Sequence, residues 1–272
     1  MPLPLARVGR EVWRRNGIDS GERAIPEETA VSFTYNGGSH AVMMATPQDL
    51  EDFAYGFSLT ENIISSPDEI KKLDVIEEPL GIELRMWLSD LRGVAYGERR
   101  RHLAGPTGCG LCGIESLEEA VRPARKVQSD ARFQPQEIMA ALNAIGPTQK
   151  LNHETRAVHA AAFWSRTLGL AATREDVGRH NALDKLAGTI TRQGLSKDDG
   201  MLVLTSRVSV EMVQKAAAIG VPLIVAISAP TALAVRTAEA ANITLVAIAR
   251  DDGFEIFTHS YRISTEPSIH VA

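Results

Sequence analysis

The two cysteines of the chain, Cys109 and Cys112, lie three positions apart in a segment framed by Gly108, Gly110 and Gly113. Glycine gives this backbone freedom and little steric cover, so we expect both thiols to be presented to solvent. Accessible thiols at this spacing can exchange with a disulfide, supply half of a zinc shell, or carry a sulfane sulfur as a persulfide. Alternatively, the two cysteines could be small apolar residues that only pack in the interior. The glycine-rich loop argues against this, because free cysteine in that role is normally buried.

A zinc site would require two further ligands. The histidines do not form a closely spaced pair, since His153 and His159 are six positions apart. A thioredoxin-like exchange site requires a stabilised thiolate, and Glu115 and Glu118 place negative charge close to Cys112. The residues alone leave the three kinds of thiol chemistry open.

A second group of polar residues opens a predicted helix within residues 173–185, where an extended stretch turns at Gly178. The free N–H groups at a helix start attract anions. Arg179 and His180 add positive charge at that start. The segment therefore predicts an anion-binding site.

Two later turns repeat this arrangement. Apolar residues 202–204 lead into a turn with Arg207, and apolar residues 223–227 lead into Ser228 and Thr231. Ligands of open α/β sheets bind beyond the carboxyl ends of the strands. Helix capping by serine and threonine is the alternative explanation, but it does not account for two arginines. The three turns together predict a pocket for a phosphate-bearing ligand.

The C-terminal half supplies the elements that position these turns. Short apolar runs at 202–204, 223–227 and 243–248 alternate with helix-like stretches, which predicts a largely parallel sheet covered on both faces. We expect a three-layer αβα domain over residues 133–272. Its expected helices cover residues 135–145, 154–165, 181–193, 210–219 and 231–241, and His159 lies on the second of them.

The N-terminal part, residues 1–104, predicts a smaller α+β domain. Residues 29–35 and 41–45 alternate like strands around a glycine turn. Thr46 then predicts the N-cap of an apolar helix that ends near Ile64, and residues 72–77 and 82–88 predict a second hairpin. Residues 105–132, which contain both cysteines, join the two domains.

The composition excludes several classes of protein. The chain has 272 residues, of which 44% are hydrophobic and 23% charged, as in ordinary globular proteins. Its net charge of −5 argues against a surface built to hold nucleic acid. Apolar runs break within about ten residues, whereas a membrane helix needs about 20. With no apolar signal region and no disulfide framework, we expect a cytoplasmic protein that binds neither nucleic acid nor membrane.

Taken together, the motifs closely resemble the FdhD family, the formate dehydrogenase accessory sulfurtransferases. The resemblance rests on the cysteine loop at 108–113 and on the eleven-residue run at 175–185. It extends to residues 55–57, 60–61, 158–161, 207–209, 211–213 and 228–231. The resemblance implies a homodimer whose C-terminal domain has a cytidine-deaminase-like fold.

The resemblance also implies a reaction and its site. Cys109 would receive sulfur from a cysteine desulfurase as a persulfide, with Cys112 beside it, and no structural metal is expected. The sulfur would pass to the bis(molybdopterin guanine dinucleotide), or bis-MGD, molybdenum cofactor, required for formate dehydrogenase activity. The residues expected to bind this cofactor are Ile248, Ala249, Arg250, Asp251, Asp252 and Gly253, with His159, Arg179, His180 and Arg207.

Three places depart from what is common in that family. Arg156 and Ala157 replace a glycine pair, Ser206 replaces a glycine, and Asp251 with Asp252 makes the last segment more acidic. The bulk of Arg156 is expected to narrow or recharge the pocket beside His159. The alternative function is a chaperone that binds and carries the cofactor without enzymatic chemistry, and a zinc-binding structural module is the third possibility.

Overall fold

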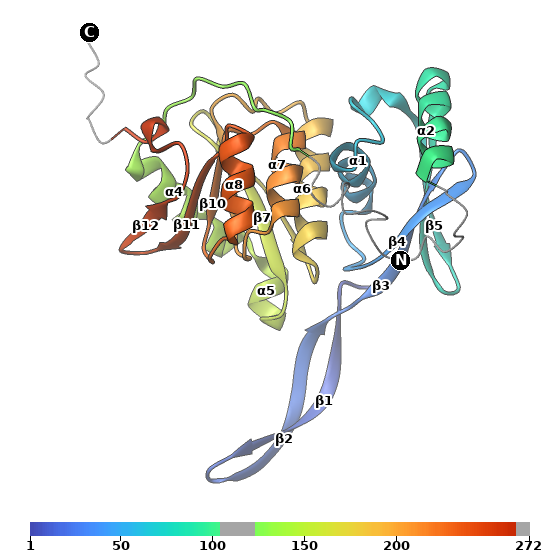
Figure 1. Ribbon diagram of the computed structural model, residues 1–272. Helices are drawn as coiled ribbons and strands as arrows, with labels where there is room; N and C mark the ends of the chain where they lie inside the picture. The colour runs from blue at the N-terminus through green and yellow to red at the C-terminus, as the bar shows by residue number, and fades with distance from the viewer. Residues whose placement is uncertain (104–122, 265–272) are drawn as a thin grey trace.

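The structure, a computed structural model, describes residues 1–103 and 123–264 (Figure 1). It contains a two-stranded arm, a four-stranded sheet and a six-stranded sheet. The four-stranded sheet belongs to the N-terminal part of the chain and the six-stranded sheet to the C-terminal part, as expected from the change in sequence pattern. In the described part of the chain, every helix is too short or too polar to cross a bilayer.

The N-terminal sheet has the strand order β4-β3-β6-β5, with β3 antiparallel to β4 and parallel to β6. Helix α1 and the inner face of the sheet bury the aromatic core, in which Phe33 stacks on Phe57 at 4.1 Å between ring centroids. This confirms the predicted order of two strands, a helix and two strands. The elements are β3 (Thr29–Tyr35), β4 (Gly38–Ala45), α1 (Leu50–Thr60), the 3-10 turn η1 (Pro67–Glu69), β5 (Ile70–Glu78), β6 (Gly81–Leu88) and α2 (Asp90–Leu103).

The start of α1 differs from the prediction. Asp49, with a left-handed φ of 53°, is the N-cap, and the helix ends at Thr60, earlier than expected. Thr46 does not cap the helix, because its hydroxyl accepts a hydrogen bond from the backbone N–H of Val177 at 3.1 Å. Thr46 therefore connects the two halves of the chain.

The C-terminal sheet has the strand order β12-β11-β10-β9-β7-β8. The prediction of a largely parallel sheet is wrong for half of it: β9, β10 and β11 are parallel, whereas β7, β8 and β12 run antiparallel to their neighbours. The strands are β7 (His159–Ser165), β8 (Gly169–Asp176), β9 (Gly200–Leu204), β10 (Leu223–Ala226), β11 (Thr244–Arg250) and β12 (Gly253–Ile256).

Helices cover both faces of this sheet, which confirms the three-layer αβα architecture (Figure 1). Alternate residues of β7 enter different cores: Phe163 packs with α6, α7 and α8, while Ala162 packs with α4 on the other face. The helices are α4 (Pro135–Ile145), α5 (Lys150–Thr155), α6 (Arg179–Arg192), α7 (Val210–Ile219) and α8 (Ala232–Ala240), with 3-10 turns η2 (Gly146–Thr148) and η3 (Ser260–Arg262).

The helix predicted over residues 154–165 does not form. Helix α5 ends at Thr155, Arg156 adopts a left-handed φ of 59° as its C-cap, and the alanine-rich segment from His159 is strand β7. Alanine favours helices in isolation. Here Ala160, Ala161 and Ala162 are buried between the two helical layers, so packing overrides the local preference.

The two halves of the chain meet where α1 packs against α6 (Figure 1). Two glycines allow the backbones to touch. A Cβ atom on Gly56 would lie 1.6 Å from the carbonyl oxygen of Asp184, and one on Gly188 would lie 1.9 Å from the carbonyl oxygen of Asp52. Any other residue at either position would force the helices apart.

Residues ahead of the N-terminal sheet form an arm that projects from the body (Figure 1). The arm consists of β1 (Leu5–Arg14) and β2 (Gly17–Pro26), which pair antiparallel in unbroken register. The sequence analysis assigned no element to this segment. Its arginines and valines do not alternate with a period of two, so the segment lacks the apolar face that normally marks a strand.

Candidate functional site

The turns expected to bind an anion meet at one edge of the six-stranded sheet. The carboxyl ends of β8, β9, β10 and β11 lie at this edge, together with the start of β7, because β7 runs antiparallel to β9. Hydrogen bonds join neighbouring segments: Ala160 N–H donates to the Thr205 hydroxyl at 2.9 Å, and Ile248 N–H donates to the Ser228 carbonyl at 3.2 Å. We call this edge the strand-end site.

Arg179 and His180 occupy the first turn of α6 at this site. The Nε atom of Arg179 is buried and has no hydrogen-bond partner among the described residues. Burial lowers the pKa of His180, and the guanidinium of Arg179 lowers it further. The His180 Nε2 atom lies 3.3 Å from a carboxylate oxygen of Glu211, a residue that the sequence analysis placed in a segment matching the family but to which it assigned no role.

His159 is the first residue of β7 and lies at the same edge. Burial lowers its pKa, and the nearby positive charge of Arg179 acts in the same direction. His159 was expected on a helix; the structure corrects its element and brings it close to Arg179. Arg156, by contrast, is exposed at the end of α5.

Among the three helix starts at this site, those of α6 and α7 have no side-chain cap, so capping does not account for their polar residues. Gly178 has no side chain to cap α6, and the Ser209 hydroxyl at the start of α7 donates to Glu211 at 2.8 Å instead of capping the helix. Only at α8 does the cap form, where Thr231 accepts from Ala234 N–H. The starts of α6 and α7 therefore direct uncapped N–H groups toward the site, as anion binding requires.

Arg207 is exposed in the turn between β9 and α7. The turn is held by a hydrogen bond from Val208 N–H to the Ala229 carbonyl, which ties it to the next strand end. Ser206 beside it is buried, with its hydroxyl 3.1 Å from the Arg207 carbonyl. The serine therefore fits the turn, and the arginine is free to reach a ligand.

The last predicted segment begins at an irregularity of β11. Ile248 has a left-handed φ of 52°, where the register with β12 shifts. A β-branched residue in this conformation is strained, and strain of this kind concentrates at functional sites. Ala249 is buried, and the Arg250 guanidinium bonds the Ile227 carbonyl at the neighbouring strand end. Asp251 and Asp252 form the exposed turn that leads to Gly253.

Several residues of the 175–185 run are buried and serve the fold. Asp176 accepts hydrogen bonds from Lys185 Nζ at 2.6 Å, from Thr46 N–H at 3.0 Å and from the Asn181 amide at 3.0 Å. Glu175 accepts from the N–H groups at the start of α5. The run thus has two roles. Arg179 and His180 lie at the start of α6 in the strand-end site, whereas Asp176 and Lys185 join the two halves of the chain through Thr46.

Two further buried ionic clusters reinforce that joint. Lys215 lies 2.9 Å from Asp184, whose pKa is raised by burial, and also bonds Glu61. Asp52 on α1 accepts from Arg174 at 2.7 Å and Arg192 at 2.6 Å. The clusters connect α1 and the adjoining Glu61 to β8, α6 and α7.

Cys109 and Cys112 lie outside the described residues. Within residues 1–103 and 123–264, there is no group of three acidic, histidine or cysteine side chains placed to hold a metal ion.

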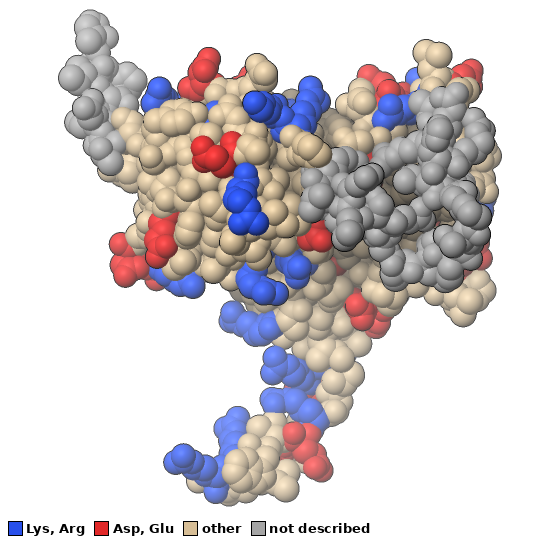
Figure 2. Space-filling view, in the orientation of Figure 1, with Lys and Arg blue, Asp and Glu red and all other residues tan. Residues whose placement is uncertain are grey.

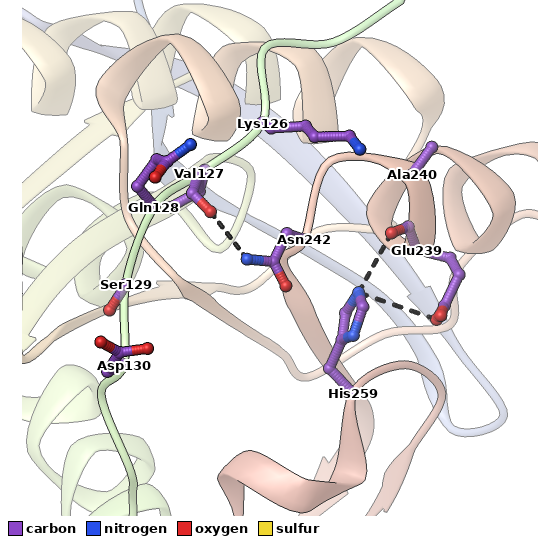
Figure 3. A pocket seen from close by; sticks show the side chains of 9 residues that line it. All are labelled: Lys126, Val127, Gln128, Ser129, Asp130, Glu239, Ala240, Asn242 and His259. Carbon is purple, nitrogen blue, oxygen red and sulfur yellow. Dashed lines mark hydrogen bonds and ion pairs between the residues drawn. The ribbon is translucent and has the colours of Figure 1, made fainter.

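A hollow of about 390 Å³ lies at the opposite edge of the sheet (Figure 3). Its wall combines cationic Lys126 with the carboxylates of Asp130 and Glu239. His259 in this hollow is already engaged, with Nε2 3.1 Å from the Glu239 carbonyl oxygen. The mixed charge gives this hollow no preference for an anion, and the strand-end site remains the candidate.

Comparison with known proteins identifies the family of the chain. A sequence profile of the FdhD/NarQ family matches residues 26–264. The chain is 54% identical to the sulfur carrier protein FdhD of Agrobacterium fabrum, covering 94% of this chain and 95% of the relative. It is 53% identical to the protein of the same name from Brucella abortus, covering 94% of this chain and 97% of that relative. The crystal structure of a candidate formate dehydrogenase accessory protein from Desulfotalea psychrophila has a TM-score of 0.77 at 25% identity, covering 97% of this chain and all of that one.

Proposed function

Because the chain belongs to the FdhD/NarQ family, we propose that it is a sulfur carrier in the maturation of formate dehydrogenase. The observation that carries the proposal is the strand-end site, where uncapped helix starts and the arginines Arg179 and Arg207 converge. A sulfur carrier for a nucleotide-bearing cofactor needs such a site to hold the acceptor while sulfur is delivered. The relatives named above are carriers of the same kind.

The acceptor that fits this site is the bis-MGD molybdenum cofactor, which is a substrate of the carrier. Its pyrophosphate groups would lie against the starts of α6 and α7, where N–H groups and guanidinium groups stabilise phosphate oxygens. The buried Nε of Arg179 supports this fit, because an unpartnered guanidinium nitrogen lacks an acceptor that a phosphate oxygen would supply.

The sulfur would travel on Cys109. Its thiolate attacks the terminal sulfur of a persulfide on a cysteine desulfurase, so one S–S bond forms as another breaks and the donor cysteine leaves as a thiolate. The terminal sulfur then passes to the molybdenum of the acceptor, and Cys109 returns to a thiolate. Persulfide sulfur is formally zero-valent, so the acceptor metal supplies the two electrons that convert it to sulfide. Cys112, three positions later in the sequence, would resolve or protect the intermediate.

The experiment that tests the carrier role is intact mass spectrometry after incubation with a cysteine desulfurase and cysteine. We expect the protein to gain one sulfur, about 32 Da, in a form that a reductant removes. Cys109→Ala should lose this gain, and Cys112→Ala is the matched control for loss of a thiol from the same loop. If the protein gains no sulfur yet still binds the cofactor, the cofactor-carrying chaperone is the better explanation.

A further inference from the structure

One carboxylate lies within the strand-end site, among groups that could otherwise contact a phosphate. Glu211 occupies the first turn of α7. Its Oε2 atom lies 3.3 Å from the Nε2 atom of His180, in the first turn of α6. The same Oε2 atom accepts a hydrogen bond from the Ser209 hydroxyl at 2.8 Å. A single oxygen of Glu211 therefore contacts side chains from both helix starts to which anion binding was assigned.

Glu211 carries a negative charge in this position. Burial raises the pKa of its carboxyl, but the Ser209 hydroxyl and His180 outweigh that effect, so the pKa lies below its ordinary value. A carboxylate oxygen accepts the same charge-assisted hydrogen bonds as a phosphate oxygen. Glu211 thus makes contacts of the kind that a bound phosphate would make at the start of α7.

The charges at the site decide how strongly it attracts an anion, because the rest of the chain offers no general attraction. The net charge of the chain is −5, and basic and acidic side chains are interspersed over the face of the C-terminal domain shown in Figure 2. Arg179 contributes positive charge and a buried Nε atom that has no hydrogen-bond partner in the described part of the chain. The negative charge of Glu211 opposes that attraction.

We propose that Glu211 is a specificity-determining residue, whose carboxylate competes with the phosphates of the ligand for His180 and Ser209. This inference rests on the proposed function, because it takes the strand-end site as the place where the acceptor pyrophosphate binds. A small anion that displaced the carboxylate would gain few contacts. A pyrophosphate group also reaches the start of α6 and Arg179, so Glu211 discriminates against small anions and leaves the larger ligand exchangeable, as a carrier requires.

Two features allow the carboxylate to be displaced. The side chain of Glu211 is 42% exposed, so its carboxylate can turn into solvent. Burial lowers the pKa of His180, and Arg179 lowers it further, so the imidazole is mostly uncharged at neutral pH. The contact between His180 and Glu211 therefore lacks the strength of a full ion pair.

Titration calorimetry on full-length variants tests the proposal with two probes, inorganic pyrophosphate and guanosine diphosphate. Glu211→Gln keeps the shape of the side chain and removes its charge. It should bind both probes about tenfold more tightly, because a like charge close to the phosphates is lost. Glu211→Asp keeps the charge and should bind both probes about as weakly as the wild type.

Glu239→Gln is the matched control, because the Glu239 carboxylate also lies beside a histidine, 3.8 Å from the Nε2 atom of His259. This substitution changes the net charge equally, but at the opposite edge of the sheet, and should leave both affinities unchanged. Circular dichroism establishes that each variant is folded.

Three results would overturn the proposal. Pyrophosphate could bind to Glu211→Gln no more tightly than to the wild type; a loss confined to guanosine diphosphate would then assign Glu211 to the guanine base. Equal tightening in Glu239→Gln would reduce the effect to net charge. If neither the wild type nor Glu211→Gln binds either probe, the proposed function of the strand-end site fails, and this inference fails with it.

Discussion

Lys185 and Asp176 form an ion pair of 2.6 Å in which neither side chain is exposed to solvent. Burial lowers the pKa of Lys185, and the carboxylate of Asp176 opposes that shift. Lys185 also donates to the Thr46 carbonyl at 2.8 Å, so one ammonium group connects β8, α6 and the N-terminal domain. Asp176 also accepts a hydrogen bond at 2.8 Å from the backbone N–H of Gly178, the N-cap of the helix that carries Arg179 and His180.

Removing one member of this pair is expected to be costly. Lys185→Met leaves the Asp176 carboxylate buried without a counter-ion, which typically destabilises a protein by about 3–5 kcal/mol. Urea unfolding measures the change. The control is Lys72→Met, which breaks an exposed pair with Asp74 of 2.8 Å and should cost less than about 1 kcal/mol. If both variants lose a similar amount of unfolding free energy, the buried pair is not the stabilising contact described above.

The glycine contact between α1 and α6 yields a second prediction. Gly56→Ala would place a methyl group against the Asp184 carbonyl, so the helices must separate. We expect a loss of at least about 2 kcal/mol of unfolding free energy, as for overpacked cores. Gly146→Ala, whose added Cβ meets no atom within 4 Å, is the control and should be near neutral. If Gly56→Ala unfolds like the control, the two backbones do not touch as described.

The elements of the C-terminal domain were largely predictable, because helices α4 and α7 and the apolar strands follow simple periodicity. The helix predicted over residues 154–165 was wrong because alanine does not indicate burial. Helices enclose this alanine-rich run on both faces, so it forms strand β7 although it would be helical in isolation. The antiparallel direction of β7 and β8 was equally hidden. Strand direction depends on connections that a hydrophobic pattern does not contain.

The candidate site was predictable for a different reason. Arg179, Arg207 and the strand-end turns could be found because a polar turn after an apolar strand places its residues at the sheet edge. The dual role of the 175–185 run could not be found, because the partners of Asp176 include Thr46, far away in the chain. Glu211 belongs to a segment that matches the family, but only the structure shows that it lies near His180.

Arg156 stands where glycine is common in the FdhD family. Its left-handed conformation predicts that this replacement lowers the free energy of unfolding. A residue with a Cβ in this conformation costs roughly 1–2 kcal/mol, whereas glycine adopts it freely. Arg156→Gly should therefore be more stable than Arg156→Ala by about 1 kcal/mol in thermal or urea unfolding. The comparison with alanine separates the backbone effect from loss of the exposed guanidinium. Equal stability of the two variants would show that Arg156 does not adopt the left-handed conformation.

The half-buried histidines His159 and His180 make the free energy of unfolding depend on pH. The pKa of His159 is lower in the folded protein than in the unfolded chain, so the unfolded chain binds more protons as pH falls below about 6.5. The free energy of unfolding should therefore decrease on acidification, by at most about 1.4 kcal/mol per pH unit for each such proton. His159→Gln should lessen that decrease, whereas His153→Gln, on the surface of α5, should not. The measurement is urea unfolding at neutral and mildly acidic pH. An unchanged pH dependence in His159→Gln would mean that His159 is not desolvated.

Arg179 provides the sharpest test of the strand-end site, because its guanidinium is partly buried at a helix start whose N–H groups have no side-chain cap. Guanosine diphosphate, the nucleotide portion of the proposed acceptor, serves as the probe in titration calorimetry. Arg179→Gln should weaken binding about tenfold or more, since a hydrogen bond to a charged phosphate contributes about 1.5–3 kcal/mol. Arg236→Gln, on the exposed side of α8, removes the same charge from the chain and should leave the affinity unchanged. Equal weakening in both variants would indicate a general electrostatic effect of net charge, whereas a selective loss in Arg179→Gln places the phosphates at the start of α6.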